Sequence, residues 1–142
     1  MFSKIAGVVG ASVLALGGML AIASPASAET NPHCSRVTQI GSTAYIKSGG
    51  TNIASVKQFK GCNKNWSYTY VWEGFRNSHK NVNWWACSGV TNGTLVDYMC
   101  GGNHQAEVWS TGANTISDCT KAYGQLEWGS GGEGWAATDQ RC

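Results

Sequence analysis

The chain is poor in charge and in proline. Of its 142 residues only 13% are charged, and 2 are proline. So little charge excludes a disordered acidic or basic tail and a long charged coiled coil. From residue 29 onward, no stretch longer than about ten residues repeats apolar side chains at helical spacing, whereas Gly, Asn, Ser, Thr, Trp and Tyr abound. These absences indicate a compact domain built mainly from strands.

Motifs of catalysis and metal binding are missing too. The chain has no Cys-x-x-Cys pair and no Gly-x-Ser-x-Gly elbow, and its glycine cluster at 129–134 lacks the Lys-Ser/Thr of a phosphate loop. His104-x-x-Glu107 is not a zinc motif, because in an extended chain its two side chains point to opposite faces. We therefore expect no catalytic residue, no metal, no cofactor and no enzyme activity.

The first 28 residues have the pattern of a secretory signal peptide. Lys4 precedes an apolar run from Ile5 to Ile22, and the small residues Ala26-Ser27-Ala28 form a cleavage site. Four glycines in this segment and the lack of a basic stop-transfer cluster argue against a membrane anchor. We expect a secreted, extracellular protein without membrane insertion of the mature chain, which forms a single β-rich domain over 29–142.

All six cysteines lie in this predicted mature chain, and an even count in a small secreted domain indicates three disulfides. Six cysteines allow fifteen pairings, and the sequence does not choose among them. The cysteines are Cys34, Cys62, Cys87, Cys100, Cys119 and Cys142.

The net charge of the mature chain is small, but its distribution is uneven. Without Lys4, nine basic residues face eight acidic ones, a net of +1 that gives no reason to invoke nucleic acid. Residues 29–80 carry seven basic and two acidic residues, whereas 81–142 carry two basic and six acidic ones. Either the two halves lie against each other and their charges neutralise, or they form separate charged patches that a partner can recognise.

Short segments separated by turn residues predict an all-β fold, a small disulfide-stabilised antiparallel sandwich or barrel of about seven to nine short strands. Gly49-Gly50 and Asn92-Gly93 predict two hairpins. The nine segments are Arg36–Ile40, Thr43–Lys47, Asn52–Phe59, Trp66–Phe75, Val82–Ser88, Thr94–Cys100, Ala106–Ser110, Gly124–Trp128 and Gly134–Thr138.

A two-residue turn at Asn92-Gly93 would set Val90 opposite Leu95 and Cys87 opposite Tyr98. This register places Trp85, Cys87, Tyr98 and Cys100 on one face of the hairpin. We expect that face, with its sulfur atoms, to point into the core.

Four aromatic residues at a spacing of two form the clearest pattern in the chain. Trp66, Tyr68, Tyr70 and Trp72 alternate with smaller residues, so in a strand all four rings point the same way. They could form a stacking platform for sugar rings, or they could be core, since aromatics must fill much of this interior. Trp84, Trp109 and Trp135 are further candidates for an interface.

The segment before the first cysteine, Glu29-Thr30-Asn31-Pro32-His33, is too short and too polar for a central strand. It is either a frayed terminus or an extended arm that inserts into a partner's cleft or adds to a partner's sheet.

These features favour a secreted, non-catalytic module that binds an extracellular protein. It would act as an inhibitor of an extracellular enzyme, or as a small subunit or adaptor of an exported complex such as an antibacterial toxin. A first alternative is a lectin-like, carbohydrate-binding protein that uses the aromatic stripe. A second is a small hydrolase with a carboxylate pair near Glu73 or Glu127.

Overall fold

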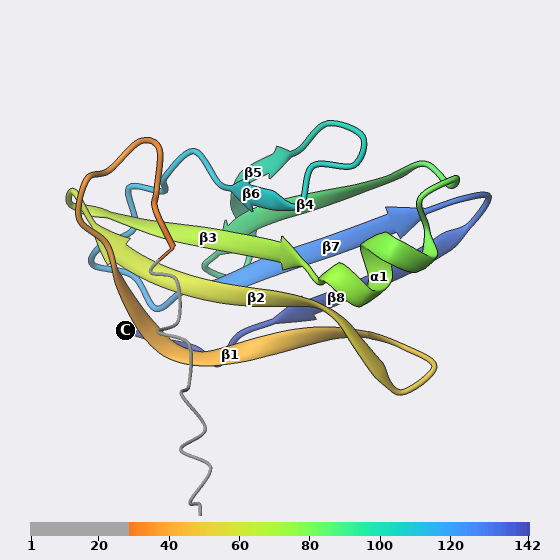
Figure 1. The fold of residues 1–142 in the computed structure, drawn as a ribbon. Helices are drawn as coiled ribbons and strands as arrows, with labels where there is room; N and C mark the ends of the chain where they lie inside the picture. The colour runs from red at the N-terminus through yellow and green to blue at the C-terminus, as the bar shows by residue number, and fades with distance from the viewer. Residues whose placement is uncertain (1–28) are drawn as a thin grey trace, which may run out of the picture.

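A computed structural model describes residues 29–142, so the predicted signal peptide lies outside the described residues. The fold is all-β, with two antiparallel four-stranded sheets that face each other as the layers of a sandwich (Figure 1). Sheet A has the order β1 (Thr38–Ser48), β2 (Thr51–Gly61), β3 (Lys64–Val71), β6 (Glu107–Trp109). Sheet B has the order β5 (Leu95–Cys100), β4 (Trp84–Thr91), β7 (Lys121–Trp128), β8 (Gly132–Ala137).

Eight strands confirm the predicted class and number, with two local differences. The first two predicted segments form one strand, β1, whose pairing with β2 is interrupted between Ile40 and Ala44. The predicted strand Trp66–Phe75 is too long, because the chain turns after Val71 into a short helix, α1 (Glu73–Ser78). Phe75 is buried on this helix, so tertiary packing rather than helix propensity explains α1.

Both predicted hairpins are present, but the register of the second differs. Cys87 lies opposite Cys100, and Val90 opposite Asp97, with an irregularity between Val90 and Thr91. This is a shift of two residues, which preserves the side on which each side chain stands. Trp85, Cys87, Tyr98 and Cys100 therefore share a face as expected.

The predicted direction of that face is wrong, because it points outward. Trp85 and Tyr98 on this face are exposed, although Cys87 between them is covered, whereas the alternate residues Ala86, Ser88 and Val90 are buried and face sheet A. When a strand has apolar or small residues on both sides, its sequence does not indicate which side packs against the other sheet.

The space between the sheets holds the main core. Its apolar part packs Phe75 of α1 edge-on against Trp84 and Trp128, which closes one end of the sandwich (Figure 1). Near the middle the sheets are joined by hydrogen bonds, and the hydroxyl of Thr69 donates to the Cys87 carbonyl at 3.0 Å. Gly124 allows this close approach, since a Cβ there would lie 2.3 Å from Val56.

A second core lies on the outer face of sheet A. It contains Cys34, Phe59, Trp66, Tyr68 and Trp109, and the N-terminal segment 29–37 lies over it. A carboxylate of this segment, Glu29, pairs with Lys57 of β2. The disulfide Cys34–Cys62 fastens the segment to the end of β2.

Three disulfides confirm the predicted number and supply the pairing that the sequence left open. They join Cys34 to Cys62, Cys87 to Cys100 and Cys119 to Cys142, and the described chain has no free cysteine. Three such bonds indicate an oxidising environment. Within 29–142, no helix is long and apolar enough to cross a membrane.

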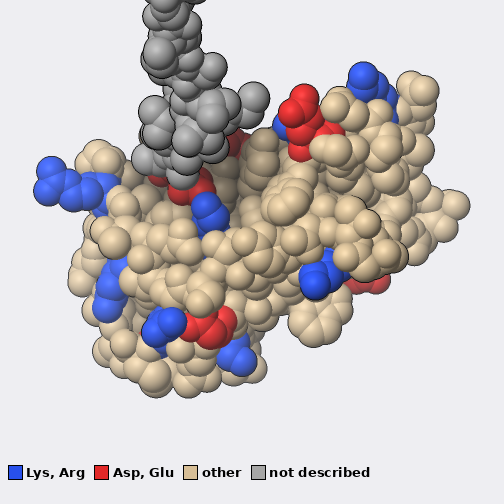
Figure 2. Space-filling view, turned by 60° about the horizontal axis from the view of Figure 1, so that its bottom comes forward, with Lys and Arg blue, Asp and Glu red and all other residues tan. Residues whose placement is uncertain are grey.

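The charge asymmetry along the chain follows the division into sheets. The basic half contains β1, β2 and β3 of sheet A, and the acidic half contains all of sheet B. The ion pairs found in the described part of the chain, Lys57 with Glu29 and Arg141 with Asp139, each stay within one half. On the face shown in Figure 2, charged side chains are scattered over a mostly uncharged surface, without a continuous field of one sign.

Candidate functional site

The outer face of sheet B presents exposed aromatic side chains in a regular array. Trp135 is 64% exposed, Tyr98 42% and Trp85 36%. Gly89 lies beneath the Tyr98 ring, because a Cβ there would be 3.0 Å from its Cδ2 atom. Strand pairing places the side chains in three rows: Tyr98, Gly89 and Tyr123; Cys100, Cys87, Gln125 and Trp135; Trp85, Glu127 and Glu133.

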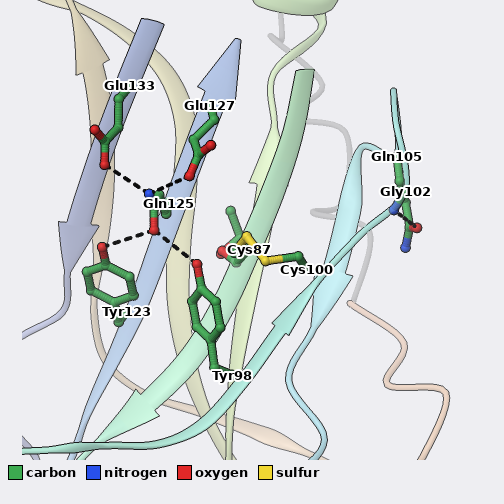
Figure 3. The surroundings of a disulfide bond; sticks show 10 residues. Cys87, Tyr98, Cys100, Gly102, Gln105, Tyr123, Gln125, Glu127 and Glu133 are labelled. Atoms are coloured by element: carbon green, nitrogen blue, oxygen red, sulfur yellow. Dashed lines mark hydrogen bonds between the residues drawn. A yellow bond between two sulfur atoms is a disulfide. The ribbon is translucent and has the colours of Figure 1, made fainter. Parts of the chain in front are cut away.

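Gln125 is the centre of this face, and all its hydrogen-bonding groups are used (Figure 3). Its carbonyl oxygen accepts from the hydroxyls of Tyr98 at 3.0 Å and Tyr123 at 3.4 Å. Its amide nitrogen donates to Glu127 at 2.8 Å and Glu133 at 2.9 Å. One amide thus orients four side chains from three strands.

The two tyrosines of this network resist ionisation. Partial burial is the largest cause of a raised pKa for both Tyr98 and Tyr123, and the negative charges of Glu127 and Glu133 raise it further. Both phenols therefore stay neutral at physiological pH and keep donating to Gln125.

The same network brings two carboxylates together. Glu127 and Glu133 lie directly opposite each other on β7 and β8, and neither forms a salt bridge within residues 29–142. Glu73, the other predicted member of a carboxylate pair, is separate, at the start of α1. The hollow beside the pair has a volume of about 170 Å³, below the roughly 300–1,000 Å³ of usual ligand pockets. A carboxylate-pair hydrolase stays a prediction.

The predicted aromatic stripe lies on the outer face of sheet A, where much of it is covered. Trp66 and Tyr68 are 2% and 3% exposed, and Tyr70 and Trp72 are half-buried. Trp66 donates its ring N–H to the Gly61 carbonyl at 2.9 Å, and the Tyr68 hydroxyl donates to Glu107 at 2.8 Å. Burial and this carboxylate raise the pKa of Tyr68 far above its ordinary value. Buried rings with satisfied polar groups favour the core alternative for this pair.

The predicted arm 29–33 provides much of the cover. Asn31 is only 4% exposed, and its side-chain oxygen accepts from the His33 backbone N–H at 2.8 Å. The imidazole of His33 stacks on Trp66 with 6.3 Å between ring centroids. A groove of about 440 Å³ remains between this segment and β6, with Thr30, Pro32 and His33 on one side and Trp109 on the other. Arm and stripe, predicted separately, thus belong to one packed region.

The remaining predicted tryptophans divide between core and surface. Trp84 and Trp109 are buried, whereas Trp135 is the most exposed large hydrophobic side chain in 29–142. Trp85, the neighbour of Trp84, is exposed, because adjacent residues of a strand face opposite sides of the sheet.

Sequence reasoning missed several members of the outer face of sheet B as site residues, namely Tyr98, Tyr123 and Gln125. Their signal was present, since Tyr123, Gln125 and Glu127 recur at a spacing of two. Without the strand pairing, however, they could not be connected with Tyr98 or Trp135.

No group of three or more His, Cys, Asp or Glu residues that could hold a metal occurs in the part of the chain that the structure describes. Comparison of the chain with protein-family models, with curated proteins and with solved structures gives no match.

Proposed function

We propose that this protein is a secreted, non-catalytic module that binds an extracellular protein through the outer face of sheet B. The observation that carries the proposal is the exposure of Trp85, Tyr98 and Trp135 on one face of the same sheet. Tryptophan and tyrosine are enriched at protein interfaces, where they contribute a large share of the binding energy.

Rigidity supports this proposal. The disulfide Cys87–Cys100 joins β4 to β5 beside the network, and Gln125 holds Tyr98, Tyr123 and the two glutamates in place (Figure 3). Side chains that are already ordered lose little entropy on binding. Such a surface suits an inhibitor of an extracellular enzyme, or a small subunit or adaptor of an exported complex such as an antibacterial toxin.

The test is capture of a partner from the culture supernatant of the producing organism by the tagged mature protein. We expect a stoichiometric protein partner that Trp135→Ala loses. Tyr45→Ala is the matched control, because Tyr45 is an exposed aromatic residue, 43% exposed, on β1 of the other sheet. Recovery of no partner, or equal loss with both variants, would contradict the proposal.

A carbohydrate ligand is the second candidate, and a specific observation on the same face favours it. The rings of Trp135 and Tyr123 are stacked, with centroids 6.1 Å apart and an angle of 26° between their planes. Stacked aromatics beside an amide and two carboxylates can hold the C–H face and the hydroxyls of a sugar. A glycan array with the wild type and Trp135→Ala separates this candidate from a protein partner.

A further inference from the structure

The two sheets have four edge strands, and only one of them is both long and open. β6 has three residues. The edges β1 and β8 lie against each other, since a Cβ at Gly134 of β8 would be 2.7 Å from Ile46 of β1. The fourth edge, β5, has six residues and pairs with β4 alone.

The β5 edge is apolar on both sides. Leu95 is 50% exposed, Val96 43%, Tyr98 42% and Met99 41%, four of the seven exposed large hydrophobics in the described chain. No backbone hydrogen bond within residues 29–142 joins β5 to an element other than β4. The peptide groups that point away from β4 are therefore free to pair with another strand.

Monomeric sheet proteins guard edge strands with lysine, proline, a β-bulge or an inward-pointing charge. β5 contains no lysine or proline, and its pairing with β4 is irregular only at its start, between Leu95 and Asp97. The single charged residue of β5, Asp97, points inward. It is already buried, with only 7% of its surface exposed, and it accepts hydrogen bonds from Thr111 and Gly112. A further strand beside β5 would consequently leave no new charge unsatisfied.

We propose that β5 pairs with β5 of a second copy of this chain, antiparallel about a two-fold axis, to form one continuous eight-stranded sheet. A two-fold contact places a surface against itself, so a net charge on that surface would repel the second copy. Asp97 is the only Asp, Glu, Lys or Arg between Val90 and Ala106 and is itself buried, so two copies of β5 can meet without repulsion between exposed charges of this strand.

The acidic groups of sheet B do not oppose this pairing. Glu127 and Glu133 stand on β7 and β8, the strands beyond β4. At about 4.8 Å per strand, the β7 strands of two copies would be about 24 Å apart, roughly three Debye lengths at physiological salt. The repulsion between the two copies is therefore largely screened.

Two properties of this dimer follow from its geometry. Each copy uses its β5 edge once, so the assembly closes at two chains. Six residues span only about 20 Å, so the contact is small and the dimer depends on concentration. The outer faces of both B sheets would lie on the same side of the joined sheet.

Sedimentation velocity of the mature, fully disulfide-bonded protein from micromolar to millimolar concentration tests this proposal. We expect a reversible shift from monomer to dimer. Val96→Lys should raise the dissociation constant about tenfold or more, because lysine is a side chain with which natural edge strands prevent pairing, and its charge would have to lose water at the new contact. Tyr45→Lys, on a different strand of the other sheet, should leave the dimer unchanged.

Hydrogen exchange of the unaltered protein provides a readout that does not depend on how the variants fold. Amide protection should rise with concentration in β5 and stay constant in β6. A monomer at all concentrations, open-ended aggregation, or a dimer that Tyr45→Lys disrupts and Val96→Lys does not would each overturn the proposal. Trp135 lies on β8, at the opposite edge of sheet B from β5. Failure of dimer formation can therefore be distinguished from failure of partner capture, which is tested with Trp135→Ala.

Discussion

Both outer faces of this sandwich carry aromatic side chains, which are mostly buried on sheet A and mostly exposed on sheet B. Sheet A places Phe59, Trp66 and Tyr68 under the N-terminal segment, where they form a second core. Sheet B leaves Trp85 and Trp135 exposed. Aromatic alternation in a strand therefore indicates only that the rings share a face, and whether that face is exposed depends on what covers it.

The N-terminal segment that covers the outer face of sheet A is fastened to the sheet at two points. Glu29 pairs with Lys57, and Cys34 is bonded to Cys62 at the end of β2. On sheet B the disulfide Cys87–Cys100 joins neighbouring strands within the sheet and fastens no covering segment. The aromatic residues of sheet A are therefore expected to contribute to stability, and the exposed ones of sheet B are those proposed to bind. Three experiments test this difference between the two faces.

The largest effect is expected from removing one tryptophan from each face. Trp66→Ala should lower the free energy of unfolding by about 3–5 kcal/mol, because it empties a buried ring site and leaves the Gly61 carbonyl without its donor. Trp135→Ala should change it by about 0.5 kcal/mol or less, since this ring is mostly in solvent. Chemical denaturation measures both, and equal losses would remove the distinction between the two faces.

A somewhat smaller effect is expected from releasing the cover. Replacing both Cys34 and Cys62 with alanine removes a cross-link between residues 28 apart in sequence. The free energy of unfolding should fall by about 3–4 kcal/mol, because the cross-link no longer restricts the unfolded chain. The variant should also make Trp66 more accessible to a fluorescence quencher. Replacing Cys87 and Cys100 is the matched control, which should cost stability without exposing Trp66.

The smallest effect is expected from tyrosine titration at alkaline pH. The pKa of Tyr68 is raised most, by burial and by its hydrogen bond to Glu107, and burial also raises the pKa of Tyr98. A phenol with a raised pKa in the folded state contributes stability that is complete below its unfolded pKa of about 10 and is lost as the pH rises toward the folded value. Tyr68→Phe should therefore flatten the alkaline loss of stability more than Tyr98→Phe does.

Denaturation of the wild type and both variants at a series of pH values from about 9 to about 12 measures this difference. Tyr70, half-buried on the same strand as Tyr68, offers Tyr70→Phe as a control for loss of a hydroxyl at this face. An alkaline slope that is unchanged in Tyr68→Phe would show that its burial is incomplete in solution.

Local patterns predicted much of the fold. Period-two alternation located the strands, and Gly49-Gly50 and Asn92-Gly93 located two hairpins, because these effects depend on neighbours in sequence. The helix α1 was missed, since it forms where Phe75 packs against Trp84 and Trp128 from distant parts of the chain. The candidate site was predicted only through Trp135 and, as a hydrolase alternative, Glu127.

By itself, the sequence determined the all-β class, the approximate number of strands, the count of disulfides and the sharing of a face by Cys87 and Tyr98. The tertiary structure alone decided the cysteine pairing and the direction of each face. The physical reason is that alternation along a strand is symmetric with respect to its two sides. Only the packing of distant segments, sheet A against Ala86 and the N-terminal segment against Trp66, buries one side of a strand and leaves the other exposed.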